Sequence, residues 1–418
     1  MTYKQAVDYI HSLLKFGIKP GLERISALMT ELGNPQSKMK FIHIAGTNGK
    51  GTTSTMMSEI LKSAGYKTGL FTSPYVFDFC ERIQINNQNI SHKDLTEIVD
   101  KVKSAVDKIL KKGIEPTEFE VITAAALLYF YRQKCDYVVL EVGLGGRYDS
   151  TNIIPAPHAA IITSISLDHT KILGNTVEQI ACEKCGIIKS GSKVITTNEQ
   201  NEKALEIIKR TANENNADLI VGGVESAKIL NENIFGTDLS FNGIKIHIPL
   251  AGRHQVENSV GVITAAKALG IADGHIKEGI ENTVIHARME IIEKEPLIML
   301  DGGHNPECAA ALANVLKNFA GDYNITVLVG MMADKDCKKY LQKILPLCKK
   351  CVVTVPDNLR SLGANELAKL SKEFVKDVEI IENPKEAYTF LKAETGKEAM
   401  LLVCGSFYLI SDIFGQNN

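Results

Sequence analysis

The chain has 418 residues, with 47 lysines and arginines against 49 aspartates and glutamates. This length exceeds what one hydrophobic core usually serves, so we expect two domains. The near balance of charge gives no support for a nucleic-acid partner, and no apolar run approaches the roughly 20 residues that a membrane span needs. An odd count of nine cysteines and an N-terminus unlike a signal peptide predict a soluble, cytoplasmic protein with reduced thiols and no membrane partner.

The first informative segment is an apolar run, Phe41–Ala45, that enters a glycine-rich loop, Gly46-Thr47-Asn48-Gly49-Lys50-Gly51-Thr52-Thr53. Glycines let backbone N–H groups converge on phosphate oxygens, Lys50 supplies a positive charge, and a threonine hydroxyl can reach Mg²⁺. We therefore expect a strand, a phosphate-binding loop and a helix over Ser54–Ala64 that Gly65 ends. Gly51 separates Lys50 from Thr52, which weakens a generic kinase or GTPase interpretation. A plain glycine turn is the alternative, but it leaves the Lys-Gly-Thr-Thr sequence unexplained.

Apolar runs recur at 68–71, 137–142, 159–165 and 193–197 with helical stretches between them. Near-continuous apolar runs indicate strands buried on both faces, so we predict a mostly parallel sheet covered by helices. Short alternating segments with Gly and Asn turns fill 219–250 and predict a small antiparallel side sheet.

A second alternation of strands and helices begins at Leu297 and predicts a smaller Rossmann-like domain. Its expected strands are 297–301, 325–329, 351–355, 378–381 and 400–404. A charged stretch at 290–296 ends in proline and is typical of a junction. We therefore expect a nucleotide-binding P-loop domain over 1–293 and a Rossmann-like C-terminal domain over 294–418.

Several polar residues that could bind a ligand follow predicted strands. Parallel sheets bind small molecules at the carboxyl ends of their strands. Glu141 ends a buried run and precedes a glycine loop that carries Arg147 and Asp149. A buried carboxylate without a cation is costly, so Glu141 favours a nucleotide-bound Mg²⁺. Ser73 offers a second hydroxyl, although, taken alone, an ordinary turn or helix cap is the better explanation. His169 is a further candidate ligand, with a hydrogen-bonded core histidine as the alternative.

Other polar residues stand in apolar surroundings. Lys184 lies in a largely apolar passage, and a buried lysine is expensive unless it is neutralised or converted. Gln255 and Asn258 come at the start of a helix of Ala and Val, consistent with a nucleotide at its N-terminus. Asp301 and His304 end the first strand of the second domain, so a nucleotide held between two domains would account for them.

Together these segments resemble the folylpolyglutamate synthase and dihydrofolate synthase family, within the superfamily of ATP-dependent muramyl-peptide ligases. The similarity runs from about Gly17 to Tyr408. The motifs that carry it are GTNGKG at 46–51, TSP at 72–74, ERI at 81–83, EVGLGGR at 141–147, DH at 168–169, EKCGI at 183–187, GRHQVEN at 252–258, DGGHNP at 301–306 and GSFYL at 405–409.

The resemblance implies a set of roles around ATP. Residues 46–51 would hold the phosphates, Gln255 and Asn258 would approach the nucleotide, Arg288 its terminal phosphate and Asp301 its ribose. Two Mg²⁺ ions are implied, the first on Thr52, Ser73 and Glu141. The second would be held by Glu141, His169 and a carbamate formed on Lys184. Lys50, Lys184 and His304 are the implied catalytic residues.

The resemblance also implies the reaction, in which a folate carboxylate is phosphorylated by ATP and the acyl phosphate is displaced by the amine of L-glutamate. The N-terminal segment 19–25 suggests dihydropteroate as a second substrate, and we expect a monomer. The implied substrate residues are Arg82, Thr117, Phe119, Glu120, Arg147, Asp149 and Ser406. Phe119 can stack on a pteridine ring, but it can equally be a core residue at a helix start.

Some positions depart from the family pattern: Tyr75 replaces histidine, His286-Ala287 replaces Pro-Gly before the arginine, and Cys185 replaces alanine. Three other functions are alternatives. A muramyl-peptide ligase is disfavoured by EVGLGGR and GSFYL. A guanine-nucleotide switch is disfavoured because its Asn-Lys-x-Asp motif is absent, Ala333-Asp-Lys-Asp336 lacking the asparagine. A nucleotide-binding scaffold without turnover can be excluded only by an activity measurement.

Overall fold

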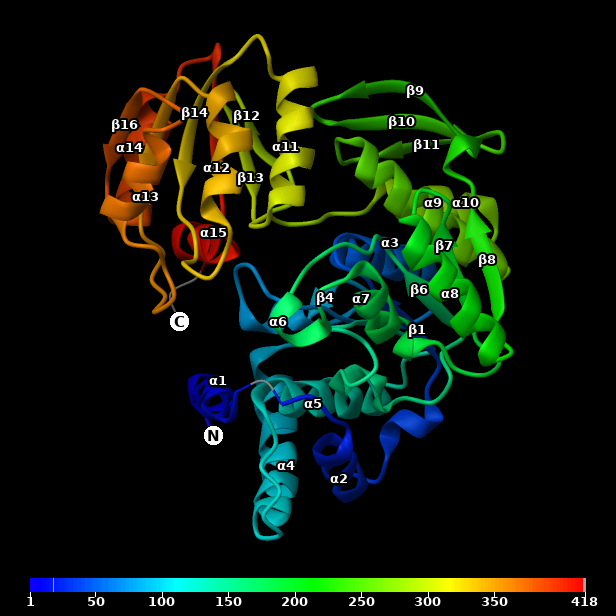
Figure 1. Cartoon of the computed structure of the whole chain (residues 1–418). Helices are drawn as coiled ribbons and strands as arrows, with labels where there is room; N and C mark the ends of the chain where they lie inside the picture. Colours follow the sequence, from blue (N-terminus) through cyan, green and yellow to red (C-terminus); the bar gives the residue numbers. More distant parts are fainter. Residues whose placement is uncertain (18, 416–418) are drawn as a thin grey trace.

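The structure is a computed structural model and describes residues 1–17 and 19–415. It contains an eight-stranded sheet and a six-stranded sheet, each covered by helices, and a small three-stranded sheet (Figure 1). The predicted α/β fold, with a mostly parallel main sheet, a small antiparallel sheet and a second, smaller α/β part, is confirmed. Among the helices of the described residues, none is both long enough and apolar enough to cross a membrane.

The main sheet has the strand order β4-β3-β2-β5-β1-β6-β7-β8 and is parallel from β2 to β8, while β3 and β4 form an antiparallel edge. Its central strand β1 is buried along its whole length, as the continuous apolar run predicted. The strands are β1 (Phe41–Ala45), β2 (Thr68–Phe71), β3 (Ile83–Ile85), β4 (Gln88–Asn89), β5 (Tyr137–Glu141), β6 (Ala159–Ile162), β7 (Lys193–Thr197) and β8 (Asp218–Gly222).

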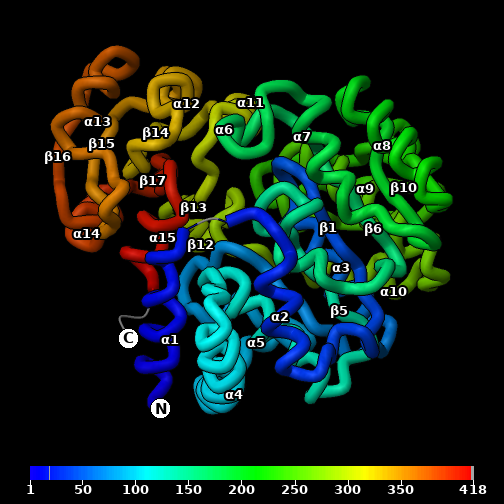
Figure 2. Tube along the Cα trace, turned by 60° about the horizontal axis from the view of Figure 1, so that its bottom comes forward, coloured from blue at the N-terminus to red at the C-terminus, as the bar shows by residue number. Residues whose placement is uncertain are grey.

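Helices cover both faces of this sheet. Successive residues of a strand point to opposite faces, so Phe41 packs in one hydrophobic cluster and Ile42 in another. One face carries α3 (Lys50–Ser63), α9 (Arg253–Ala268) and α10 (Asp273–Glu281). The other face carries α1 (Tyr3–Ser12), α2 (Glu23–Glu31), α4 (His92–Leu110) and α5 (Glu118–Arg132), grouped together in Figure 2, and further along α7 (Val177–Lys184) and α8 (Glu202–Glu214).

The side sheet is smaller than predicted. It consists of the antiparallel strands β9 (Ala227–Asn233), β10 (Gly236–Phe241) and β11 (Ile244–Ile248). The segment from 219, which we assigned to these hairpins, instead lies in β8 and pairs parallel with β7 in the main sheet. A short apolar run does not reveal its pairing partner, so tertiary contact with β7 decided this point.

The six-stranded sheet has the order β12-β13-β17-β14-β15-β16 and is parallel apart from β12. Its strands are β12 (Glu290–Lys294), β13 (Leu297–Asp301), β14 (Asn324–Val329), β15 (Lys350–Val353), β16 (Asp377–Ile380) and β17 (Ala399–Cys404). One face packs on α11 (Pro306–Phe319), α12 (Cys337–Ile344) and α13 (Ala364–Ser371), and the other on α14 (Pro384–Glu394) and α15 (Phe407–Phe414).

The junction expected at 290–296 is not a linker. Glu290–Lys294 forms β12, which pairs antiparallel with β13 at the edge of the six-stranded sheet. Charged residues are common on edge strands because one side of such a strand faces water, and this explains why the segment resembled a linker. A boundary after residue 293 would cut β12, so we propose that the second domain begins before this strand.

Candidate active site

The phosphate loop lies between β1 and α3. The helix begins at Lys50, four residues earlier than predicted, because Thr53 N already donates to Gly49 O at 2.9 Å. The first amides of a helix have no intrahelical acceptor, so those of α3 are available to an anion. Gly49 has φ +83°, and a side chain at Gly46 would overlap Thr163. Both glycines are therefore required by the path of the loop.

Two lysines converge on this loop. Lys50 Nζ donates to Gly46 O at 3.0 Å and to Thr47 O at 3.1 Å. Lys184, at the end of α7, is only 3% exposed and donates from Nζ to the same Gly46 oxygen at 2.7 Å. Burial, and then the charge of Lys50, lower the pKa of Lys184 to about 7. A large share of Lys184 is therefore a neutral amine at neutral pH.

Glu141 ends β5 beside the first turn of α3. It is 5% exposed, and its Oε2 accepts a hydrogen bond from Ser73 N at 2.9 Å. Both carboxylate oxygens lie within 3.8 Å of where a Cβ would stand on Gly51. Burial raises the pKa of Glu141, and the positive charge of Lys50 offsets part of that rise. The site therefore holds a carboxylate whose charged form a bound cation would stabilise.

We call the cavity around these groups the phosphate cavity. It has a volume of about 310 Å³ and lies between the main sheet and the six-stranded sheet. Of the predicted site residues, it is lined by Thr47, Asn48, Gly49, Lys50, Gly51, Thr52, Ser73, Glu141, His169, Gln255, Asn258, Arg288, Asp301 and His304. Gly46 and Lys184 stand behind this lining. The structure thus gathers segments that are far apart in the chain.

The residues from the second half of the chain are fixed by local contacts. Asp301 accepts hydrogen bonds from Gly303 N at 2.9 Å and from Met289 N at 3.1 Å, so both of its oxygens are engaged. The Arg288 guanidinium lies over the Phe407 ring at 4.6 Å. Burial, and then the charge of Lys335, lower the pKa of His304 to about 4. His304 is therefore a neutral imidazole at pH 7.

The predicted Mg²⁺ ligands suit the first ion better than the second. Glu141, Thr52 and Ser73 offer a carboxylate and two hydroxyl oxygens in one cavity, which suits Mg²⁺ because this ion keeps several waters and binds phosphate oxygens. His169 lies beside Asp168, with 3.7 Å between Nε2 and Oδ2, and is partly exposed. Within the described residues, the only trio of His, Cys, Asp or Glu side chains with ligand atoms within 4.8 Å of one another lies elsewhere.

A second cavity, of about 690 Å³, adjoins the first, and we call it the aromatic cavity. Its lining combines aromatic, aliphatic and basic side chains: Leu14, Lys19, Arg82, Phe119, Tyr148, Ile172 and Tyr408. The buried Nε of Arg82 has no hydrogen-bond partner within the described residues. Phe119 lines this cavity, and its ring centroid also lies 5.8 Å from that of Phe71, so it is both a wall residue and a core residue.

Several predicted substrate residues also make structural hydrogen bonds, and three of them, Thr117, Glu120 and Asp149, line the aromatic cavity as well. Thr117 and Glu120 form the capping box at the start of α5, and Glu120 also pairs with Arg24 at 3.0 Å. Asp149 caps a short 3₁₀ helix and accepts from Leu144 N at 2.8 Å. Ser406 caps α15 by accepting from Tyr408 N at 3.0 Å. These caps were not anticipated as the main contacts of these side chains.

Arg147 does not reach either cavity. Its side chain is half exposed and lies against α7, where it donates to Cys182 O at 3.3 Å and stands 3.9 Å from Glu183. The glycine loop turns this position outward while Asp149, two residues later, points inward. A substrate role for Arg147 therefore has no support in the geometry.

Sequence reasoning missed Glu307. Its Oε2 accepts hydrogen bonds from Asn48 Nδ2 and from Ser166 Oγ, both at 2.6 Å. Glu307 lies in the first turn of α11, so it joins the second part of the chain to the phosphate loop. A glutamate in the first turn of a helix is common, and its partners are too distant in sequence for any pattern to indicate them.

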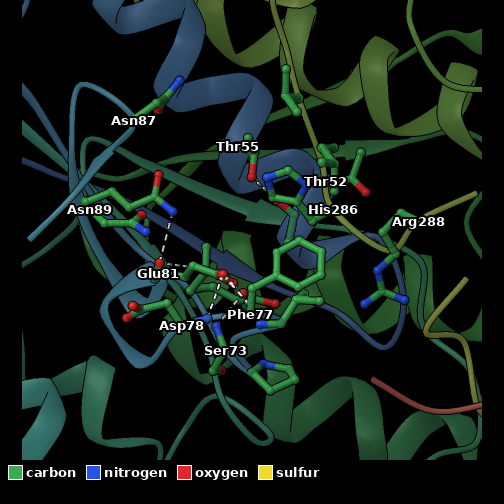
Figure 3. Close-up of a pocket in the computed structure, with 18 of the residues that line it drawn as sticks. Thr52, Thr55, Ser73, Phe77, Asp78, Glu81, Asn87, Asn89, His286 and Arg288 are labelled. Atoms are coloured by element: carbon green, nitrogen blue, oxygen red, sulfur yellow. Dashed lines mark hydrogen bonds between the residues drawn. The ribbon is translucent and has the colours of Figure 1, made fainter. Parts of the chain in front are cut away.

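A third cavity, of about 760 Å³, opens from the phosphate cavity on the other side, and we call it the side cavity (Figure 3). The two share Thr52, Ser73, Glu141, Arg288 and Phe407. Farther out, its walls carry the polar residues Thr55, Asn87, Asn89 and His286 among apolar ones such as Val284. A polar molecule can therefore reach the phosphate loop from this direction.

Comparison with known proteins matches residues 44–266 to the Mur ligase middle domain and residues 287–407 to the Mur ligase, glutamate ligase domain. The chain is 37% identical to the dihydrofolate synthase/folylpolyglutamate synthase of Bacillus subtilis, over 99% of this chain and 98% of that protein. Among solved structures, the folylpolyglutamate synthase of Thermotoga maritima superposes with a TM-score of 0.86 at 33% identity, covering 98% of this chain and 95% of that one. Escherichia coli FolC in complex with DHPP and ADP superposes with a TM-score of 0.85 at 27% identity, covering 98% of this chain and 96% of that one. The resemblance seen in the motifs is confirmed, and the chain belongs to the dihydrofolate synthase/folylpolyglutamate synthase family of Mur-type ligases.

Proposed function

We propose that this protein uses ATP to join L-glutamate to the carboxylate of a folate, and also to that of dihydropteroate, through an acyl phosphate. One observation carries the proposal: the aromatic cavity and the phosphate cavity share Ser73, Pro74 and Gly143. A pteridine held in the first cavity can therefore extend its carboxylate into the second. The name of the Bacillus subtilis relative includes both activities.

The phosphate loop would bind ATP through the amides of residues 46–52 and the ammonium of Lys50. Lys50 now donates to two loop carbonyls, and it can exchange these contacts for phosphate oxygens without a change in the loop. Thr52, Ser73 and Glu141 would hold the first Mg²⁺. When bound, Mg²⁺ neutralises charge on the phosphate oxygens. Gln255 and Asn258 would lie against the nucleotide, as the lining of the cavity supports.

Lys184 is suited to carbamate formation. The reaction with carbon dioxide requires a neutral amine, and burial keeps a large share of Lys184 in that form. Nζ would form an N–C bond to carbon dioxide and release a proton to solvent, which leaves an anion with two oxygen atoms. This anion, with Glu141 and His169, would supply the second Mg²⁺ site. Oxygen donors are what Mg²⁺ prefers, whereas an amine is not.

The chain's own groups would then assist two displacements. As the substrate carboxylate attacks the γ-phosphorus, Lys50 and Arg288 offset the charge on the transferred group. L-glutamate would enter through the side cavity, where Arg288 stands at the junction. Its amine attacks the acyl carbon and phosphate leaves. His304 Nδ1 lies 3.4 Å from Gly302 O, so Nε2 of the neutral ring is left to accept a hydrogen bond from the amine.

We further propose that the protein acts as a monomer in the cytoplasm. The proposal is supported by Thr52, Glu141, Arg288 and His304, which come from distant parts of one chain and line the same cavity. Oligomeric state can be measured by sedimentation at several protein concentrations. A site that worked only in an oligomer would show activity per subunit that falls on dilution.

The central experiment is ATP-dependent phosphate release with L-glutamate, with dihydropteroate and tetrahydrofolate compared as acceptors and Lys50→Ala as the blank. Turnover with both acceptors supports the two activities together. Turnover with tetrahydrofolate alone would limit the enzyme to elongation of the glutamate tail. Turnover with neither would contradict the proposed function and favour a muramyl-peptide acceptor.

A further inference from the structure

Asp78, Cys80 and His92 form a cluster that the mechanism does not use. Asp78 lines the side cavity, whereas Cys80 and His92 line none of the three cavities. Within the described residues, the cluster is the only trio of His, Cys, Asp or Glu side chains whose ligand atoms all lie within 4.8 Å of one another. Asp78 and Cys80 belong to the short 3₁₀ helix η3 (Phe79–Arg82) and its N-cap, and His92 begins α4. Asp78 is labelled in Figure 3, beside Glu81.

The side chains of the cluster are already oriented. Asp78 Oδ1 accepts from Cys80 N at 2.6 Å and from the Tyr3 hydroxyl at 3.3 Å. Oδ2 therefore points elsewhere, and it lies 3.5 Å from His92 Nε2. The His92 ring stacks on Tyr3 with its centroid 3.6 Å away and the planes 7° apart, which fixes the direction of Nε2. The Cys80 sulfur, on a residue only 2% exposed, lies 3.8 Å from the same tyrosine oxygen.

The spacing of the oxygen and nitrogen donors, 3.5 Å, fits a metal ion, and all three ligand atoms lie within 4.8 Å of one another. Ligand bonds of about 2.0 to 2.3 Å in a tetrahedron place neighbouring ligand atoms roughly 3.3 to 3.7 Å apart, which includes the observed oxygen-to-nitrogen distance. The donors are one carboxylate oxygen, one imidazole nitrogen and one sulfur. Zn²⁺ accepts this combination, whereas Mg²⁺ prefers oxygen alone. The cluster therefore differs in kind from the oxygen-rich ligand set around Glu141.

We propose that Asp78 Oδ2, Cys80 Sγ and His92 Nε2 bind one Zn²⁺ ion, with a water as the fourth ligand. The thiol proton leaves to solvent as the sulfur–zinc bond forms. Half of the His92 side chain is exposed, so both the ion and the water can enter from that side. Tyr3 positions the ligands through its hydroxyl and its ring and is not itself one of them.

The ion would act on a segment that serves both substrate cavities. Glu81 accepts backbone hydrogen bonds from Val76 at 2.7 Å, Phe77 at 2.9 Å and Asp78 at 2.9 Å, so the chain between Ser73 and Arg82 is one connected turn. Ser73 lines the phosphate cavity and Arg82 the aromatic cavity. Zn²⁺ on the cluster would tie this turn to α4. Because it binds the folded chain, it should raise the melting temperature.

The test uses Co²⁺ as a spectroscopic probe on protein freed of metal with a chelator. Binding at this cluster should give a sulfur-to-cobalt charge-transfer band that saturates at one equivalent, a signal that the oxygen and nitrogen ligands of the Mg²⁺ sites cannot produce. Cys80→Ser should abolish the band. Cys135→Ser, which alters another buried free thiol, should leave it unchanged.

A second variant keeps the proposal testable if Cys80→Ser does not fold. His92→Ala changes a half-exposed side chain and should weaken Zn²⁺ affinity at least about tenfold, as measured by competition with a chelating dye. Zn²⁺ should also raise the melting temperature of the wild type but not of this variant. Three results would each overturn the proposal: no saturable sulfur-to-cobalt band, a band that persists in Cys80→Ser, or unchanged Zn²⁺ affinity in His92→Ala.

Discussion

The phosphate cavity and the aromatic cavity differ in how the chain builds them. The phosphate cavity takes its main groups from short motifs at the carboxyl ends of β1, β5 and β13, where parallel sheets place their ligands. The aromatic cavity is assembled from Leu14 near the N-terminus, Arg82 after β2, Phe119 on α5 and Tyr408 on α15. The first cavity is therefore visible as motifs, while the second depends on how distant helices pack.

The electrostatics of the two cavities differ as well. Burial is the largest cause of the shifts in the pKa values of Glu141, Lys184 and His304 around the phosphate cavity. In the aromatic cavity burial also raises the pKa of Asp149, but Glu120 pairs there with Arg24, and both carboxylates take part in caps. Variants in the first cavity should therefore change turnover with every acceptor, and variants in the second should change acceptor binding.

The largest effect is expected from Lys50→Ala. Removing a charge that stabilises the transferred phosphoryl group should lower kcat/KM about 10²- to 10³-fold with both dihydropteroate and tetrahydrofolate. Steady-state phosphate release measures this. Lys103→Ala is the control, because Lys103 lies on α4 in an exposed pair with Asp107, outside the three cavities, and should remain near wild type. A loss confined to one acceptor would contradict the assignment of Lys50 to ATP.

Glu141→Gln should separate catalysis from stability. We expect kcat to fall about 100-fold because the carboxylate that holds Mg²⁺ is lost. Without Mg²⁺, the melting temperature should stay level or rise, because burial disfavours the charged form of Glu141. The same substitution at Glu120, which is equally buried but paired with Arg24, should lower the melting temperature. A marked loss of stability in Glu141→Gln would indicate an ion pair at that position.

The carbamate on Lys184 predicts a pH dependence. The pKa of Lys184 is lowered to about 7, so the reactive neutral amine is scarce below that pH and predominant above it. The ¹³C carbamate signal formed from labelled bicarbonate should therefore rise as pH increases through about 7 and then level off. Lys184→Ala should lose this signal, and its kcat should fall at least about tenfold. Undiminished activity of that variant without bicarbonate would refute the carbamate.

The smallest effect belongs to the aromatic cavity. Phe119→Leu keeps most of the apolar volume but removes the ring, so KM for the acceptor should rise up to about tenfold from lost stacking. The KM for ATP and the melting temperature should change little. If Phe119 served only the core, Phe119→Leu would alter the melting temperature and leave the KM for the acceptor unchanged.

The fold could be predicted closely where local signals were strong. β1, β2, β7 and β13 have the predicted bounds because continuous apolar runs mark strands that are buried on both faces. The errors fall where pairing decides the structure: β8 joins the main sheet, and β12 replaces an expected linker. The charged pattern of the edge strand β12 therefore resembled a junction between two domains.

The sequence by itself determined the phosphate loop, Glu141, Lys184 and the family to which the chain belongs, because short motifs fix backbone shape and donor type locally. Tertiary structure alone decided that Arg147 points away, that Ser406 and Asp149 cap helices, and that Glu307 reaches Asn48. It also brought Asp78, Cys80 and His92 together. Each of these depends on a side-chain contact whose geometry only the folded chain specifies.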